Sequence, residues 1–128
     1  SAPALAALAE AVHSPDPLVA ARATLAGGRL ERPDAVPGLV ALVAAGQDDV
    51  EAAEVLGRLA QDERLRDQIA TTVASALPDA HPEARQRLAT ALAEIPGALA
   101  DSILRALAAD ADRGVSTAAC FVLRGRQP

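Results

Sequence analysis

The stretch His-Pro-Glu-Ala-Arg-Gln-Arg-Leu-Ala-Thr-Ala-Leu, residues 81–92, decides the fold. Within it Ala84, Leu88 and Leu92 recur every four residues, which places them on one face of an α-helix. Glu83 and Arg87 also lie four residues apart and belong to a polar stripe on the same helix. The stretch therefore predicts an amphipathic helix with one apolar and one polar side.

The same pattern recurs at regular intervals along the chain. Val19, Val50 and Val115 each open a helical segment in which a small residue and then a leucine follow, as they do after Ala84. The four anchors are separated by 31, 34 and 31 residues, a period typical of arrays of stacked helix pairs. The largely buried residues of such an array would be Val19, Leu25, Val50, Leu56, Leu88, Leu92, Val115 and Val122.

Composition favours helices over strands. Hydrophobic residues make up 51% of the 128 residues and charged residues 23%, which is a globular balance. Alanine, the best helix former, is abundant, and Phe121 is the sole aromatic residue. No segment alternates with period two, and residues such as Gly27-Gly28 are interpreted as breaks between helices. We expect a single all-α domain, residues 1–128, with helices at about 2–12, 16–27, 34–46, 48–61, 63–77, 81–95, 97–109 and 112–124.

Several of these segments resemble bacterial HEAT repeats. Residues 81–92 look like the second helix of such a repeat, which typically reads Asp-Pro-x-Val-Arg followed by alanines and a leucine. Asp16-Pro17-Leu18-Val19 begins in the same way, and residues 35–42 are similar to the first helix, with its early proline and leucine-rich stripe. The arginine after the anchor is kept only at Arg85. The resemblance implies a right-handed α-solenoid of about four antiparallel HEAT-like helix pairs with degenerate repeats.

The resemblance also implies where such a protein binds its partner. Second helices of HEAT pairs line a concave surface, and two of the predicted second helices carry polar stripes. The residues predicted to bind are Glu51, Glu54, Arg58, Arg87 and Glu94. Such stripes are ordinarily explained as the solvent-exposed face of a helix, and the more specific interpretation is a partner-binding groove. We expect a non-catalytic protein-binding or scaffolding module that uses its concave face. A regulatory or accessory fragment of a larger enzyme or complex is the alternative.

Catalytic, metal and nucleic-acid sites have weaker support. Only His13 and His81 supply imidazoles, and Asp48-Asp49 with Glu51 is the nearest approach to a metal-binding cluster. Gly27-Gly28 lacks the Lys-Ser or Lys-Thr that follows a phosphate-binding loop. We therefore expect no cofactor and no enzyme activity. A HEAT-like domain that binds nucleic acid is a further alternative, which the net charge of −5 and the scattered arginines disfavour.

The ends of the chain and its cysteine carry further expectations. The first helix holds one charge, Glu10, and Phe121, Val122 and Leu123 point in three directions about 100° apart. One neighbouring pair cannot bury all three, so we expect an exposed Phe121 and an end-to-end contact with a second copy or with flanking repeats. Cys120 is expected to be a buried free thiol. The absence of a signal peptide and of a membrane-spanning run predicts a cytoplasmic location.

Overall fold

The computed structural model describes the backbone of residues 2–126 and the side chains of residues 3–126. The α-helices of this part are α1 (Ala2–Ala11), α2 (Pro17–Arg29), α3 (Val36–Ala45), α4 (Asp49–Leu59), α5 (Glu63–Ala76), α6 (Pro82–Ala91), α7 (Ala98–Ala108) and α8 (Arg113–Arg126). Two short 3-10 helices, η1 (Pro33–Ala35) and η2 (Leu92–Glu94), precede α3 and follow α6. No strand occurs between residues 2 and 126, so the expected all-α class is confirmed.

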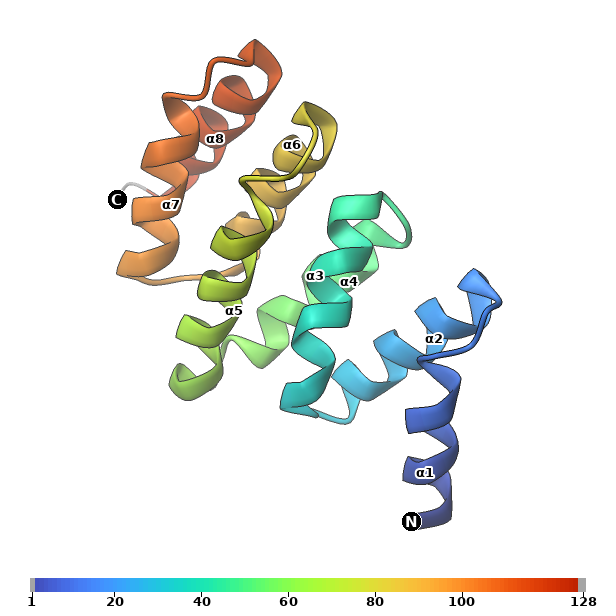
Figure 1. The fold of residues 1–128 in the computed structure, drawn as a ribbon. Helices are drawn as coiled ribbons and strands as arrows, with labels where there is room; N and C mark the ends of the chain where they lie inside the picture. Colours follow the sequence, from blue (N-terminus) through green and yellow to red (C-terminus); the bar gives the residue numbers. More distant parts are fainter. Residues whose placement is uncertain (1, 127–128) are drawn as a thin grey trace.

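The helices follow one another across the molecule in two layers (Figure 1). In this view α3, α5 and α7 lie in front of α4, α6 and α8, and the two termini lie at opposite ends. Contacts join neighbouring pairs: α2 packs on α3 and α4, α3 packs on α5 and α6, and α6 packs on α8. Two features depart from a regular row of helix pairs. α1 packs mainly on α2, and α5 has few close backbone contacts with α6. The first and third pairs are therefore the most loosely closed.

Local signals in the sequence set several helix boundaries. The carboxylate of Asp16 accepts a hydrogen bond from the backbone N–H of Leu18 at 2.9 Å, which starts α2. Asp62 starts α5 in the same way, by accepting from the backbone N–H of Arg64 at 3.0 Å. α3 ends at Ala45 and is capped by Gly46, whose φ of 71° lies in the left-handed region that favours glycine. These signals explain why the predicted helix positions agree closely with the structure.

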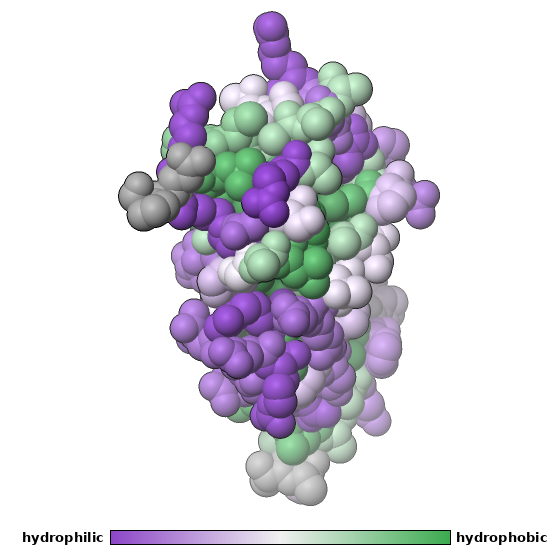
Figure 2. Space-filling model, turned by 90° about the vertical axis from the view of Figure 1, so that its left-hand side faces the viewer, coloured by the Kyte–Doolittle hydropathy of each residue, from purple (hydrophilic) through white to green (hydrophobic). Residues whose placement is uncertain are grey.

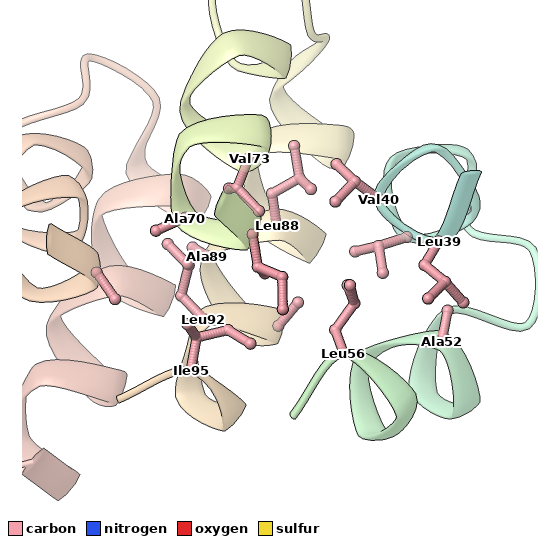
Figure 3. Packing of buried hydrophobic residues seen from close by; sticks show 14 of the residues in the cluster. Leu39, Val40, Ala52, Leu56, Ala70, Val73, Leu88, Ala89, Leu92 and Ile95 are labelled. Carbon is pink, nitrogen blue, oxygen red and sulfur yellow. The ribbon is translucent and has the colours of Figure 1, made fainter. Parts of the chain in front are cut away.

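A cluster of buried hydrophobic residues runs from α2 to α8. Figure 3 shows its centre, where side chains of α3, α4, α5 and α6 converge around Leu88. Most of the predicted core is buried as expected, namely Leu25, Leu56, Leu88, Leu92, Val115 and Val122. The prediction is wrong for Val19 and Val50, whose side chains are 42% and 69% exposed.

The two errors share one cause: the repeat was aligned on residues that do not face the core. The phase of the repeat, meaning the positions that face the core, was therefore shifted. In α4 the buried face begins at Ala52 and continues at Leu56. Val50 precedes Ala52 by two residues, which turns its side chain about 200° around the helix axis. In α2 Val19 precedes the buried Ala21 by the same step. The apolar bulk of valine made these positions look like core, whereas the helices pack through alanine.

With the phase corrected, the repeat becomes more regular. The anchors are Ala21, Ala52, Ala84 and Val115, separated by 31, 32 and 31 residues. All are buried except Ala84, which is half-buried. The residues four and seven positions after each anchor are buried in every case: Leu25 and Gly28, Leu56 and Leu59, Leu88 and Ala91, Ala119 and Val122. Each second helix thus buries the same face.

Gly27-Gly28 does not end the helix, contrary to the prediction. α2 continues through both glycines to Arg29. A Cβ atom on Gly28 would lie 2.5 Å from Cγ1 of Val55 and 2.9 Å from Cδ1 of Leu39. Since real Cβ atoms do not approach other carbons so closely, α3 and α4 can pack on α2 at this distance only because residue 28 has no side chain.

An ion pair links the third helix pair to the fourth. Arg85 on α6 donates to the carboxylate of Asp110 from Nε at 3.0 Å and from Nη2 at 3.2 Å, and Nη1 donates to the carbonyl of Ala80 at 2.7 Å. Asp110 also accepts from the backbone N–H of Asp112 at 2.9 Å. The hydrogen bonds from Arg85 and then from Asp112, with the charge of the arginine, hold the pKa of Asp110 below its ordinary value.

We expect Asp110→Asn to lower the free energy of unfolding at neutral pH and to have less effect in acid. Because the folded-state pKa of Asp110 is lowered, its contribution is complete above the unfolded-state value of about 3.9 and is lost as pH falls through the folded-state value. Urea unfolding followed by far-ultraviolet circular dichroism over a series of pH values measures this. Asp67→Asn, at an exposed carboxylate of α5, is the control and should change stability by less than about 0.5 kcal/mol. A loss from Asp110→Asn that stays constant into strong acid would contradict the prediction.

Candidate functional site

A groove of about 410 Å³ runs between α4 and α6. Its lining residues come from α3, α4, α6 and η2: Val43, Asp49, Val50, Ala53, Glu54, Glu83, Gln86, Arg87, Thr90, Ala91 and Glu94. Three of the five residues predicted to bind a partner, Glu54, Arg87 and Glu94, line this groove. The structure therefore brings together Glu54 from the first polar stripe and Glu83, Arg87 and Glu94 from the second.

Arg87 has a structural task that its place in the stripe did not reveal. Its Nε donates to the carbonyl of Val43 at 3.1 Å, and its Nη2 donates to the carbonyl of Ala44 at 2.6 Å. These carbonyls belong to the last turn of α3, where the helix carries a partial negative charge, and the carbonyl of Val43 also accepts from the backbone N–H of Gly46 at 3.1 Å. Gly46 lies against the guanidinium, since a Cβ atom there would be 3.1 Å from Cζ of Arg87. Arg87 thus caps α3 and closes one wall of the groove.

The other two predicted residues lie outside the groove. Glu51 forms an ion pair with Arg29, so it faces α2 rather than α6. Arg58 lines a separate hollow, whose wall includes Glu31 from the turn after α2 and Gln68 from α5. The five predicted residues therefore lie in three separate places: the groove, the contact between α4 and α2, and the hollow beside α5.

Eight of the eleven lining residues were not predicted to bind, among them Asp49, Val50 and Glu83. Asp49 and Glu83 stand in the first turns of α4 and α6, where acidic residues stabilise a helix in any case. Val50 was assigned to the core, although it is 69% exposed in the groove. The signal that could have found Val50 is its position two residues before the buried face that starts at Ala52.

The remaining candidates for chemistry stand apart from one another. His81 is the N-cap residue of α6, but its side chain makes no capping hydrogen bond. His13 lines a hollow of about 390 Å³ between α1, α2 and α3. Cys120 was expected to be buried, but its side chain on α8 is only half-buried, because no helix of the described chain packs beyond α8. Within residues 2–126 no group of three or more His, Cys, Asp or Glu side chains is placed to hold a metal ion.

The lengths and hydropathies of the helices in the described part of the chain also bear on membrane crossing. None of the helices between residues 2 and 126 combines the length and the apolar character that crossing a bilayer requires.

Comparison with known proteins gives no match. No family model, no curated protein and no solved structure is significantly similar to this chain. The groove itself is therefore the main guide to function.

Proposed function

We propose that the chain is a right-handed α-solenoid of HEAT-like helix pairs that binds a partner protein without catalysing a reaction. Two observations support the architecture. The same buried face recurs in α2, α4, α6 and α8 every 31 or 32 residues, and contacts run mainly between neighbouring pairs. Under this proposal the second helices line the concave side, as the resemblance of residues 81–92 implies.

The groove between α4 and α6 is the observation that carries the binding proposal. Its volume of about 410 Å³ lies in the range of ligand-binding clefts. It combines an exposed apolar side chain, Val50, with the carboxylates of Glu54 and Glu94. It offers carboxylate, amide and apolar contacts, and its one threonine, Thr90, donates its hydroxyl hydrogen to the carbonyl of Gln86. These groups suit non-covalent recognition of a polypeptide segment.

A steric block of the groove tests the proposal. Peptides displayed on phage would be selected for binding to the immobilised protein. We expect their capture to fall about tenfold or more with Ala53→Gln, which places a longer uncharged side chain in the groove. Ala41→Gln is the matched control, because Ala41 is an exposed alanine of α3 outside this groove. Equal capture by the two variants would remove the groove from consideration.

The charge of the groove also bears on the alternatives. Carboxylates repel the phosphates of nucleic acid, so this surface disfavours a nucleic-acid partner. A regulatory or accessory fragment of a larger enzyme or complex would use the same groove, with a neighbouring subunit as its occupant.

A second candidate function is end-to-end self-association. Phe121 on α8 is 74% exposed and Leu99 on α7 is 39% exposed. Figure 2 looks toward the α7 and α8 end of the molecule and shows an apolar area in its upper half. At the other end Leu18 and Val19 are 53% and 42% exposed.

The exposed apolar side chains at both ends favour a second copy as the occupant. Charge does not distinguish the ends, since the first pair carries the exposed Arg22 and Arg29 besides Glu10 and Asp16. Two different ends meeting in this way make a head-to-tail contact.

Phe121→Glu should weaken this association by about tenfold or more, because it places a charge in an apolar contact. Sedimentation velocity over a series of concentrations measures the effect. Val50→Glu, an equally exposed valine away from both ends, is the control and should sediment like the wild type. A wild-type protein that remains monomeric at the highest concentration would exclude this second function.

A further inference from the structure

We infer that the groove between α4 and α6 takes a basic, amphipathic segment of its protein partner, an inference that rests on the function proposed above. Four carboxylates line the groove: Asp49, Glu54, Glu83 and Glu94. None of them forms an ion pair within residues 3–126. The one cation in the lining, Arg87, is held by the carbonyls of Val43 and Ala44. The groove is therefore acidic and lacks a mobile counter-charge of its own.

The segment that contains α3 and α4 is rich in acidic residues. Residues 33–62 contain six acidic residues and one arginine, a net −5 that equals the formal charge of the entire chain. Three of these acids are already paired, since Asp34, Glu51 and Asp62 contact arginines. The three that are left, Asp48, Asp49 and Glu54, lie at the start and in the middle of α4.

Helix stability does not account for all of these carboxylates. Asp49 and Glu83 stand at helix N-termini, where the helix dipole favours negative charge. Glu54 lies in the middle of α4 and gains little from the dipole. Glu94 follows the C-terminal end of α6, where the dipole disfavours a carboxylate. Both carboxylates are exposed to solvent and are therefore accessible to a cationic partner.

An apolar strip lies between the carboxylates and defines the rest of the partner. Val50 is 69% exposed and Ala53 lines the groove beside it. Along α6 and η2, Glu83 and Glu94 are separated by a rise of roughly 16 Å, about three helical turns. A segment of about that length fits, provided it carries Lys or Arg on its edges and an apolar side chain along its middle. A nucleic acid would be repelled, and an uncharged apolar segment would leave the carboxylates unmatched.

The test uses displayed peptides of about twelve residues, the length of three helical turns. The full chain would be used to select binders. The most enriched peptide would then be synthesised and titrated against three forms of the chain. These are the wild type, the groove variant Glu54→Gln/Glu83→Gln/Glu94→Gln, and the control Glu10→Gln/Glu63→Gln/Asp67→Asn, whose carboxylates are exposed elsewhere.

We expect the enriched peptides to be net basic with an apolar residue. Affinity should fall about tenfold or more in the groove variant, change less than about twofold in the control, and weaken as salt is added. Neutral or acidic peptides whose binding is lost with Ala53→Gln but not with the groove variant would overturn this inference and leave the proposed function standing. If no peptide responds to Ala53→Gln, both fail.

Discussion

Leu88→Ala should lower the free energy of unfolding by about 2–5 kcal/mol. Leu88 is fully buried on α6, at the centre of the cluster in which α3, α4, α5 and α6 meet (Figure 3). Removing its terminal carbons forfeits their burial and leaves a cavity, because helices held by other contacts close only partly around it. The chain contains no Trp or Tyr, so the unfolding is best followed in urea by far-ultraviolet circular dichroism.

Leu18→Ala is the matched control for this prediction. Leu18 is 53% exposed in the first turn of α2, so the same change there should alter stability by less than about 0.5 kcal/mol. An equally small effect at Leu88 would mean that α6 does not turn this face toward the core.

Gly28→Ala should destabilise the protein, whereas Gly27→Ala should stabilise it. In both cases alanine improves helix propensity by about 1 kcal/mol. At Gly28 the new Cβ atom would meet Val55 at 2.5 Å and Leu39 at 2.9 Å, and overpacking of this kind costs about 1–3 kcal/mol. At Gly27 the nearest atom, Cβ of Ala35, is 3.6 Å away, an ordinary contact.

The comparison is sharp because the two glycines are neighbours on one helix. Denaturant unfolding of the two variants should give changes of opposite sign relative to the wild type. If both variants are stabilised, α2 lies farther from α3 and α4 than the structure places it. If both are destabilised, the two glycines serve a bend and not a close approach.

The helices could be predicted from the sequence because their boundaries depend on local chemistry. Asp16 and Asp62 cap the helices that follow them, and Gly46 supplies a left-handed residue at the end of α3. The phase of α2 and α4 could not be predicted by ranking hydrophobicity. Alanine buries little area, yet Ala21 and Ala52 occupy the contact surface because short side chains let helices approach closely.

The candidate site was predicted only in part, for a related reason. Glu54 and Glu94 were found because polar stripes are visible within single helices. The cap that Arg87 makes on α3 joins residues 44 positions apart, and no periodicity within α6 indicates it. The pairing of Glu51 with Arg29 likewise depends on how α4 rests on α2.

The even spacing of Ala21, Ala52, Ala84 and Val115 has a consequence for how such a chain changes length in evolution. A segment that runs from one anchor to the next holds a complete helix pair with its loops. Duplicating or deleting that segment therefore keeps the buried faces of the flanking helices in phase. Inserting one residue inside a helix instead turns everything after it by about 100° and moves the buried face toward solvent. Selection should accept whole-unit changes and changes in loops, and reject single insertions within α2, α4, α6 or α8.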